Sequence, residues 1–244
     1  MKHRILAIFG IIGVFSLGAL GAIWAQAFLM PFLSSRPSFQ EWGFVQDWNN
    51  RTTVVREVRE VVIRIDEAAQ RVASRTEAMV VGLESRSGNL VIGGSGFVVT
   101  SDGFLLTLAS QVPQGYEVWV YLEEGVDPVS GEVLKRDFQK NLAIVKIDER
   151  NLPTTGFADS VQVGAPVVLV AKSVEAGSLV TIVNQGSIRT RDKDVVRTNI
   201  FDKITLGGSP LLNLEGNIVG LSTFEPSGRL VAIPASVLRA FSGF

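Results

Sequence analysis

Two side chains that carry much of protein chemistry are almost missing from this chain. Its 244 residues include no cysteine and a single histidine, His3, close to the N-terminus. The absence of cysteine excludes disulfides and thiol catalysis. A Ser-His-Asp triad is excluded because His3 precedes a long apolar run and no other imidazole exists to serve as the base. Metal sites built on histidine or cysteine are excluded too, and we expect no cofactor.

An excess of charge of one sign is also lacking. The chain has 23 Lys and Arg residues and 24 Asp and Glu residues, for a formal net charge of −1. A protein that binds nucleic acid needs a basic surface to neutralise phosphates, so we expect no nucleic-acid partner. The acidic turn with Glu123, Glu124 and Asp127 is more typical of a solvated hairpin tip than of a calcium site. We therefore expect no metal.

The N-terminus is a long apolar stretch. Lys2 and Arg4 precede residues 5–33, which are almost uninterruptedly apolar, and a helix of about 20 such residues spans the roughly 30 Å of a bilayer core. A small-x-small sequence ending at Ala27 makes a cleaved signal peptide the alternative. Because the run is longer than a signal core, we expect residues 1–33 to be a single-pass anchor with a cytoplasmic N-terminus. The rest of the protein is then extracytoplasmic, either periplasmic or at the cell surface.

Residues 34–75 are expected to form a linker and a helical stalk. Apolar residues recur at spacings of four and three from Val54 to Val72, as on one face of an amphipathic helix. The series is shorter than three heptads, which is little for a coiled coil. Two alternatives stay open: a helix that packs on its own domain, and a strand, because Val61-Val62-Ile63 is β-branched.

Residues 76–244 form the third part of the chain and have a different pattern. About ten short apolar runs alternate with turn residues such as Gly, Asn, Asp and Pro. This pattern predicts an all-β sandwich or barrel. Helical patterns do not alternate with the runs, which argues against a parallel α/β sheet.

Four segments of this part, taken together and in order, resemble the HtrA (DegP/DegS-type) trypsin-like serine proteases. They are Gly94–Thr107 (G-S-G-F and D-G-F-L-L-T), Asn141–Ile147 (N-L-A-I-V-K), Gly207–Gly220 (G-G-S-P-L-L-N) and Val231–Pro234 (V-A-I-P). The resemblance covers about residues 68–241. It implies a trypsin-like fold of two perpendicular six-stranded antiparallel β-barrels with the active site between them, and it implies trimers. Many relatives also carry a PDZ domain. No sequence remains after Phe244 for such a domain, so we expect none.

By this resemblance, the family's catalytic positions fall on residues that cannot perform its chemistry. The histidine falls on Ser110, which is no base near neutral pH, and the aspartate falls on Asn141, which is uncharged. The nucleophilic serine falls on Gly207, which has no side chain with which to attack a carbonyl. The oxyanion-loop glycine falls on Thr205, where a side chain disfavours positive φ angles.

The sequence therefore indicates a membrane-anchored pseudoprotease. Such a protein could hold extended or unfolded peptides by strand addition, or modulate an active relative in a homotrimer or a mixed oligomer. The alternative is an active envelope endopeptidase with relocated residues, in which Ser209 is the nucleophile and Lys203 the base. The register of Pro210 with the family motif opposes this alternative. A third hypothesis makes the domain an inert module that positions something through the stalk.

Overall fold

The structure, a computed structural model, describes residues 18, 21, 24–29, 32, 67–175 and 177–243. The chain divides into two compact units, Met1–Ile65 and Asp66–Phe244. In the first unit the described residues are helical, and η1 (Ala25–Leu29) is a turn of π-helix. No helix in the described part of the chain is long and apolar enough to cross a membrane. Most of the expected anchor, residues 5–33, and of the expected stalk, residues 34–75, lies outside the described residues.

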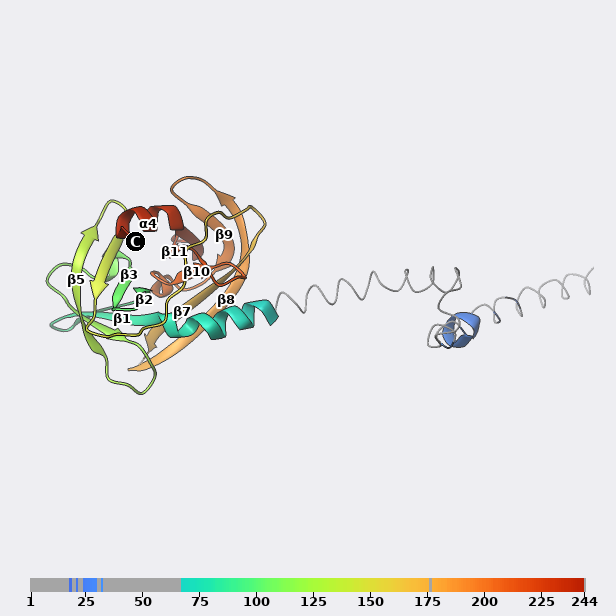
Figure 1. Cartoon of the computed structure of the whole chain (residues 1–244), viewed down its shortest axis with the longest axis horizontal. Helices are drawn as coiled ribbons and strands as arrows, with labels where there is room; N and C mark the ends of the chain where they lie inside the picture. Colours follow the sequence, from blue (N-terminus) through green and yellow to red (C-terminus); the bar gives the residue numbers. More distant parts are fainter. Residues whose placement is uncertain are drawn as a thin grey trace, which may run out of the picture. The chain divides into compact units, whose positions relative to one another are not determined.

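The second unit is built from two closed antiparallel β-barrels of six strands each. The first barrel has the order β1-β2-β3-β6-β5-β4 and comprises β1 (Val80–Ser87), β2 (Leu90–Thr100), β3 (Phe104–Thr107), β4 (Glu117–Tyr121), β5 (Val129–Asp137) and β6 (Leu142–Lys146). The second has the order β10-β11-β12-β9-β8-β7 and comprises β7 (Pro166–Glu175), β8 (Ser178–Arg191), β9 (Val196–Phe201), β10 (Pro210–Leu212), β11 (Ile218–Phe224) and β12 (Arg229–Pro234). In Figure 1 the first barrel runs from teal to yellow-green and the second is orange. The predicted double-barrel fold is confirmed.

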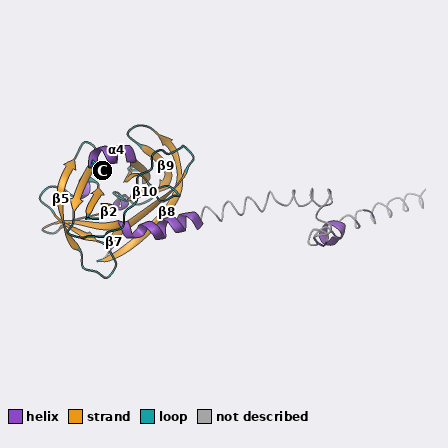
Figure 2. Ribbon diagram, in the orientation of Figure 1, coloured by secondary structure: helices purple, strands orange, loops and turns teal. Residues whose placement is uncertain are grey.

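Helices make up little of the second unit, as Figure 2 shows. They are residues 67–76, η3 (Glu77–Met79), η4 (Ala109–Gln111), η5 (Ile204–Leu206) and α4 (Ala235–Ser242). The last of them, α4, follows the second barrel but contributes Phe241 to the core of the first. Lys135 of β5 donates a hydrogen bond of 2.7 Å to the carbonyl of Phe241, near the C-terminal end of α4, where cations are favoured. The C-terminal helix thus ties the two barrels together.

The helix of residues 67–76 packs against the second unit through one face. Ala69, Val72 and Ala73 are buried and join the core of the first barrel. Their spacing is that of one side of an α-helix. The described end of the Val54–Val72 series is therefore helical, and it packs on its own domain. The compact unit begins at Asp66 and not at residue 76 because these side chains belong to its core.

Strand β7 lies where the two cores meet, and its sequence reflects this position. Val168 and Val170 join the core of the first barrel, whereas Val167 and Leu169 join the core of the second. Side chains alternate between the two faces of a strand, so a strand with both faces buried reads as one apolar run. The apolar run from Val167 to Ala171 ends at Lys172, which is also buried.

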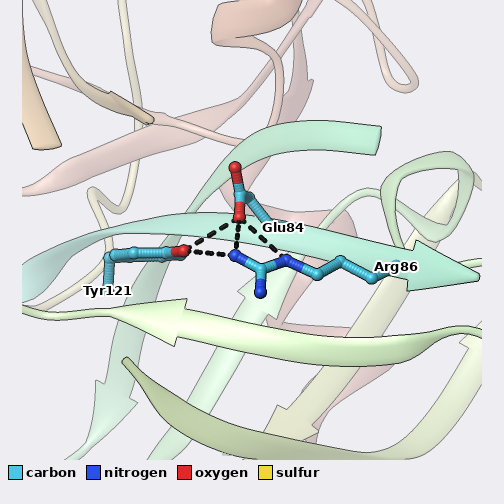
Figure 3. Close-up of polar contacts among 3 residues, drawn as sticks. All are labelled: Glu84, Arg86 and Tyr121. Carbon is cyan, nitrogen blue, oxygen red and sulfur yellow. Dashed lines mark hydrogen bonds and ion pairs between the residues drawn. The ribbon is translucent and has the colours of Figure 1, made fainter. Parts of the chain in front are cut away.

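A polar cluster lies across the seam between β1 and β4, the pairing that closes the first barrel (Figure 3). Arg86 donates to a carboxylate oxygen of Glu84 and, over 2.7 Å, to the hydroxyl of Tyr121, which itself donates to Glu84 over 2.8 Å. Burial raises the pKa of Tyr121, and its hydrogen bond to Glu84 raises that pKa further. The phenol therefore remains a donor, and the cluster stabilises the closure of the barrel.

Candidate functional site

The structure brings together Ser110 and Asn141, the two residues that the resemblance aligns with the catalytic histidine and aspartate. Ser110 lies in η4, and its backbone N–H donates to Oδ1 of Asn141 over 2.9 Å. The N–H of Ala109 donates to the backbone carbonyl of Asn141 over 3.3 Å. Asn141 has a φ of 53°, in the left-handed region that asparagine tolerates better than most residues. The side-chain amide of Asn141 thus binds the backbone of η4 and does not orient a catalytic base.

Gly207, aligned with the nucleophile, lies against the residues that flank Ser110. A Cβ atom built on Gly207 would lie 3.0 Å from Cδ1 of Leu108, 3.3 Å from the carbonyl oxygen of Ile204 and 3.4 Å from Nε2 of Gln111. Contacts this short require the neighbours to move. The aligned positions therefore share one site, in which a Cβ at residue 207 fits only if its neighbours move by a few tenths of an ångström.

The loop before Gly207 is closed into a turn of 3-10 helix, η5. The N–H of Gly207 donates to the carbonyl of Ile204 over 3.0 Å, and the N–H of Leu206 donates to that of Lys203 over 3.1 Å. In trypsin-like catalysis, the backbone N–H groups of the nucleophile and of the residue two positions before it stabilise the oxyanion. Here the first of these N–H groups points back into the turn. The second belongs to Thr205, which is exposed within η5.

Gln111 connects this loop to the first barrel. Its Nε2 donates to the carbonyl of Gly207 over 2.5 Å, and the N–H of Ser95 donates to the same carbonyl over 3.2 Å. The hydroxyl of Thr107 lies 2.9 Å from Oε1 of Gln111 and 2.7 Å from the carbonyl of Ser95. Gln111 and Thr107 are both buried, so these bonds are shielded from water. They fix the loop of the second barrel against β2 of the first.

Ser209 and Lys203, the proposed alternative dyad, have other partners. Ser209 is fully buried, and its hydroxyl donates to the carbonyl of Leu206 over 2.6 Å. Nζ of Lys203 is exposed and lies 3.6 Å from a carboxylate oxygen of Glu175. No hydrogen bond joins the two in the described part of the chain. A nucleophile and its base must lie within hydrogen-bond reach of each other, so this geometry does not support the alternative.

Sequence reasoning missed two of the residues that shape this site. Ile204 supplies the acceptor that occupies the N–H of Gly207, and Gln111 holds the carbonyl of the same residue. The sequence carries no signal for either, because the first is a backbone contact and the second joins residues 96 positions apart. In the part of the chain described, no group of three or more His, Cys, Asp or Glu side chains could hold a metal.

Comparison with known proteins identifies the same family along the chain. Residues 94–221 match the trypsin-like peptidase domain. A DegP-like periplasmic serine endoprotease of Rhizobium meliloti is 34% identical over 163 residues, which are 60% of this chain and 32% of that protein. The serine protease HTRA1A of Danio rerio is 28% identical over 215 residues, 82% of this chain and 41% of that protein. The chain thus spans between 32% and 41% of the length of these relatives.

Solved structures share the fold. A serine endoprotease from Yersinia pestis superposes with a TM-score of 0.64 at 23% identity, covering 72% of this chain and 65% of that one. A protease of M. tuberculosis, solved in its active form, gives a TM-score of 0.63 at 22% identity, covering 70% of this chain and 82% of that one. Similarity at this level of identity supports the double-barrel fold and says nothing of chemistry.

Proposed function

Because this chain belongs to the trypsin-like peptidases and, among them, to the HtrA type, we propose that it is a pseudoprotease that binds extended peptides without hydrolysing them. One observation carries the proposal. At the position aligned with the nucleophile there is a glycine, and its N–H, which an active enzyme would offer to the oxyanion, is bonded to the carbonyl of Ile204. Neither the nucleophile nor the electrostatic stabilisation of a tetrahedral intermediate is in place.

Binding without hydrolysis is supported by a strand edge in the second barrel. Ser222 of β11 exchanges backbone hydrogen bonds with Gly208 and Ser209, on the side of the strand that faces away from β12. Backbone groups alternate along a strand, so the N–H and C=O of Phe224 point to that same side. The pairing of β10 with β11 ends where Pro210 lies opposite Leu221. Beyond Leu221, the described residues supply no strand on this side of β11. An extended peptide can pair with this edge.

The proposed location is outside the cytoplasm, with residues 5–33 as a membrane anchor. The apolar length of this segment supports the proposal, as does the periplasmic location given for the DegP-like relative of Rhizobium meliloti. Residues 34–66 would then lead from the membrane to the barrels. Assembly as a homotrimer, or as a mixed oligomer with an active relative that it modulates, is part of the same proposal.

The full chain, purified in mild detergent, is expected to bind unfolded casein and to leave it intact. We would measure binding by fluorescence anisotropy of labelled casein, cleavage by gel, and active-site chemistry by labelling with a fluorophosphonate. An active HtrA protease serves as the positive control. Neither cleavage nor labelling is expected. Cleavage that disappears in a Ser209→Ala variant would establish the relocated endopeptidase instead.

A pair of variants tests the strand edge. Phe224→Pro removes both the side chain and the N–H of residue 224, whereas Phe224→Ala removes the side chain alone. Phe224→Pro is expected to bind casein about ten-fold more weakly than Phe224→Ala, the worth of one hydrogen bond or slightly more. Thermal melting of both variants controls for folding. Equal affinity of two folded variants would place casein elsewhere, and no binding by the unchanged chain would rule out the peptide-binding function.

A further inference from the structure

Lys172 is a buried charge that the proposed peptide-binding function does not use. It lies on β7 at the end of the apolar run that separates the two cores, and it is only 6% exposed. Its backbone N–H donates to the hydroxyl of Ser95 over 3.3 Å, which fixes its main chain against the first barrel. The side chain extends to the end of β4, where Nζ donates to the carbonyl of Leu122 over 2.6 Å. The ammonium group thus lies at the junction of the two barrels.

The surroundings of this ammonium satisfy it incompletely. A lysine has three N–H donors, and the carbonyl of Leu122 is the acceptor that the described residues provide for Nζ. Burial lowers the pKa of Lys172, and the carboxylates of Glu77 and Glu123 act in the opposite direction without forming an ion pair with it. A buried charge without a close counterion is costly. An anionic group that reached Nζ would relieve this cost.

Lys172 lines an open pocket of about 550 Å³, a volume within the range of small-molecule sites. The pocket has three sources: the lead-in to the first barrel (Glu77), the loop after β4 (Glu123 and Glu124), and the β7–β8 hairpin of the second barrel. Leu179, which is buried, and Val180, which is partly exposed, form an apolar wall. None of the three glutamates has an ion-pair partner among the residues described. The pocket thus combines one buried cation, free carboxylates and aliphatic surface.

This combination selects for a ligand that carries both charges. A simple anion would be attracted to Lys172 but repelled by three carboxylates, and a simple cation would meet the reverse. A zwitterion can place its carboxylate on Nζ and its ammonium among the glutamates. The wall of Leu179 and Val180 favours an aliphatic remainder. We propose that this pocket binds a free α-amino acid with an aliphatic side chain, a function separate from peptide binding at β11.

The test uses the full chain in mild detergent and three probes of one carbon skeleton. L-leucine carries both charges, 4-methylpentanoate lacks the ammonium, and 3-methylbutylamine lacks the carboxylate. Titration calorimetry is expected to show saturable binding of L-leucine at or below about 10 mM, and binding of each single-charge analogue at least about ten-fold weaker. No saturable heat with L-leucine, or equal affinity for either analogue, would overturn the proposal.

Variants connect the binding to the pocket. Lys172→Met keeps the length of the side chain and is expected to lower the affinity for L-leucine at least about ten-fold, while Lys140→Met, in the turn before β6, is expected to leave it unchanged. Lys172→Met is expected to fold, because Nζ of Lys172 bonds to a carbonyl and forms no ion pair among the described residues, so its removal leaves no buried counterion unpaired. Glu123→Gln, which leaves Lys172 in place, is expected to weaken the binding of L-leucine but to strengthen the binding of 4-methylpentanoate.

The outcomes separate this inference from the proposed function. Undiminished leucine binding by Lys172→Met or by Glu123→Gln would show that the site lies elsewhere. Casein binding is expected to be unchanged by Lys172→Met and by saturating L-leucine, since it takes place at β11. A failure of leucine binding therefore leaves casein binding intact, and a failure of casein binding leaves the pocket intact.

Discussion

Placing the family's triad residues at the three aligned positions, by Ser110→His, Asn141→Asp and Gly207→Ser, is expected to give a folded protein that still neither cleaves casein nor reacts with a fluorophosphonate. The new Cβ would lie 3.0 Å from Cδ1 of Leu108 and 3.3 Å from the carbonyl oxygen of Ile204, contacts that require these neighbours to move. The N–H of residue 207 would remain bonded to the carbonyl of Ile204, so the oxyanion would lack its first donor. Loss of one such donor costs about 10²–10³ in rate, and here the nucleophile is crowded as well.

Opening the turn is the step that should change this result. Adding Thr205→Gly removes the Cβ that disfavours positive φ angles in the oxyanion loop. The four-fold variant is expected to show the first measurable fluorophosphonate labelling, by mass spectrometry of the intact chain. Its matched control keeps Gly207 and carries only Ser110→His, Asn141→Asp and Thr205→Gly; having no nucleophile, it should not label. If the variant with only Ser110→His, Asn141→Asp and Gly207→Ser were labelled at the rate of an active HtrA protease, the η5 turn would open freely and would not limit the reaction.

The fold could be predicted from the sequence because its signals are local. Short apolar runs with turn residues between them indicate strands, and a strand with both faces buried, such as β7, reads as a continuous run from Val167 to Ala171. The motif segments then give the order of the strands by resemblance. Where the compact unit begins was not predictable in this way. The apolar residues of 67–76 fit a free stalk as well as a packed helix, and only their burial against the first barrel decides between the two.

The candidate site was predictable in its residue types and not in its geometry. The resemblance aligned Ser110, Asn141 and Gly207 with the catalytic positions, and these three residues do lie in one neighbourhood. Whether the oxyanion donor is free depends on a backbone bond between Gly207 and Ile204, for which no side chain leaves a signature. Lys172 did carry a signal, a cation directly after an apolar run, but a sequence does not tell whether such a lysine is buried beside a pocket or exposed at a strand end.

Replacing Gly208 by alanine is expected to be severely destabilising, by at least about 3 kcal/mol. Gly208 has a φ of 85°, where a Cβ alone costs about 1–2 kcal/mol. The added Cβ would also lie 2.1 Å from the backbone carbonyl oxygen of Ser95, and 2.6 Å from Oε1 of Gln111. Backbone cannot give way as a flexible side chain can, so the loop and β2 must separate. Thermal melting of the full chain should show a decrease in Tm of about 6–12 °C.

Gly115→Ala is the matched control, since Gly115 has nearly the same φ, 83°, and nothing lies within 4 Å of the added Cβ. It is expected to cost only the backbone term, about 1–2 kcal/mol. Equal decreases in the two variants would show that the contact with Ser95 is not limiting. A larger loss at Gly208 would mean that the glycine after the aligned nucleophile position is required by the approach of the two barrels. On the proposed pseudoprotease function, this would explain why Gly208 and Pro210 are present next to Gly207: the close backbone contact serves folding, which does not depend on catalysis.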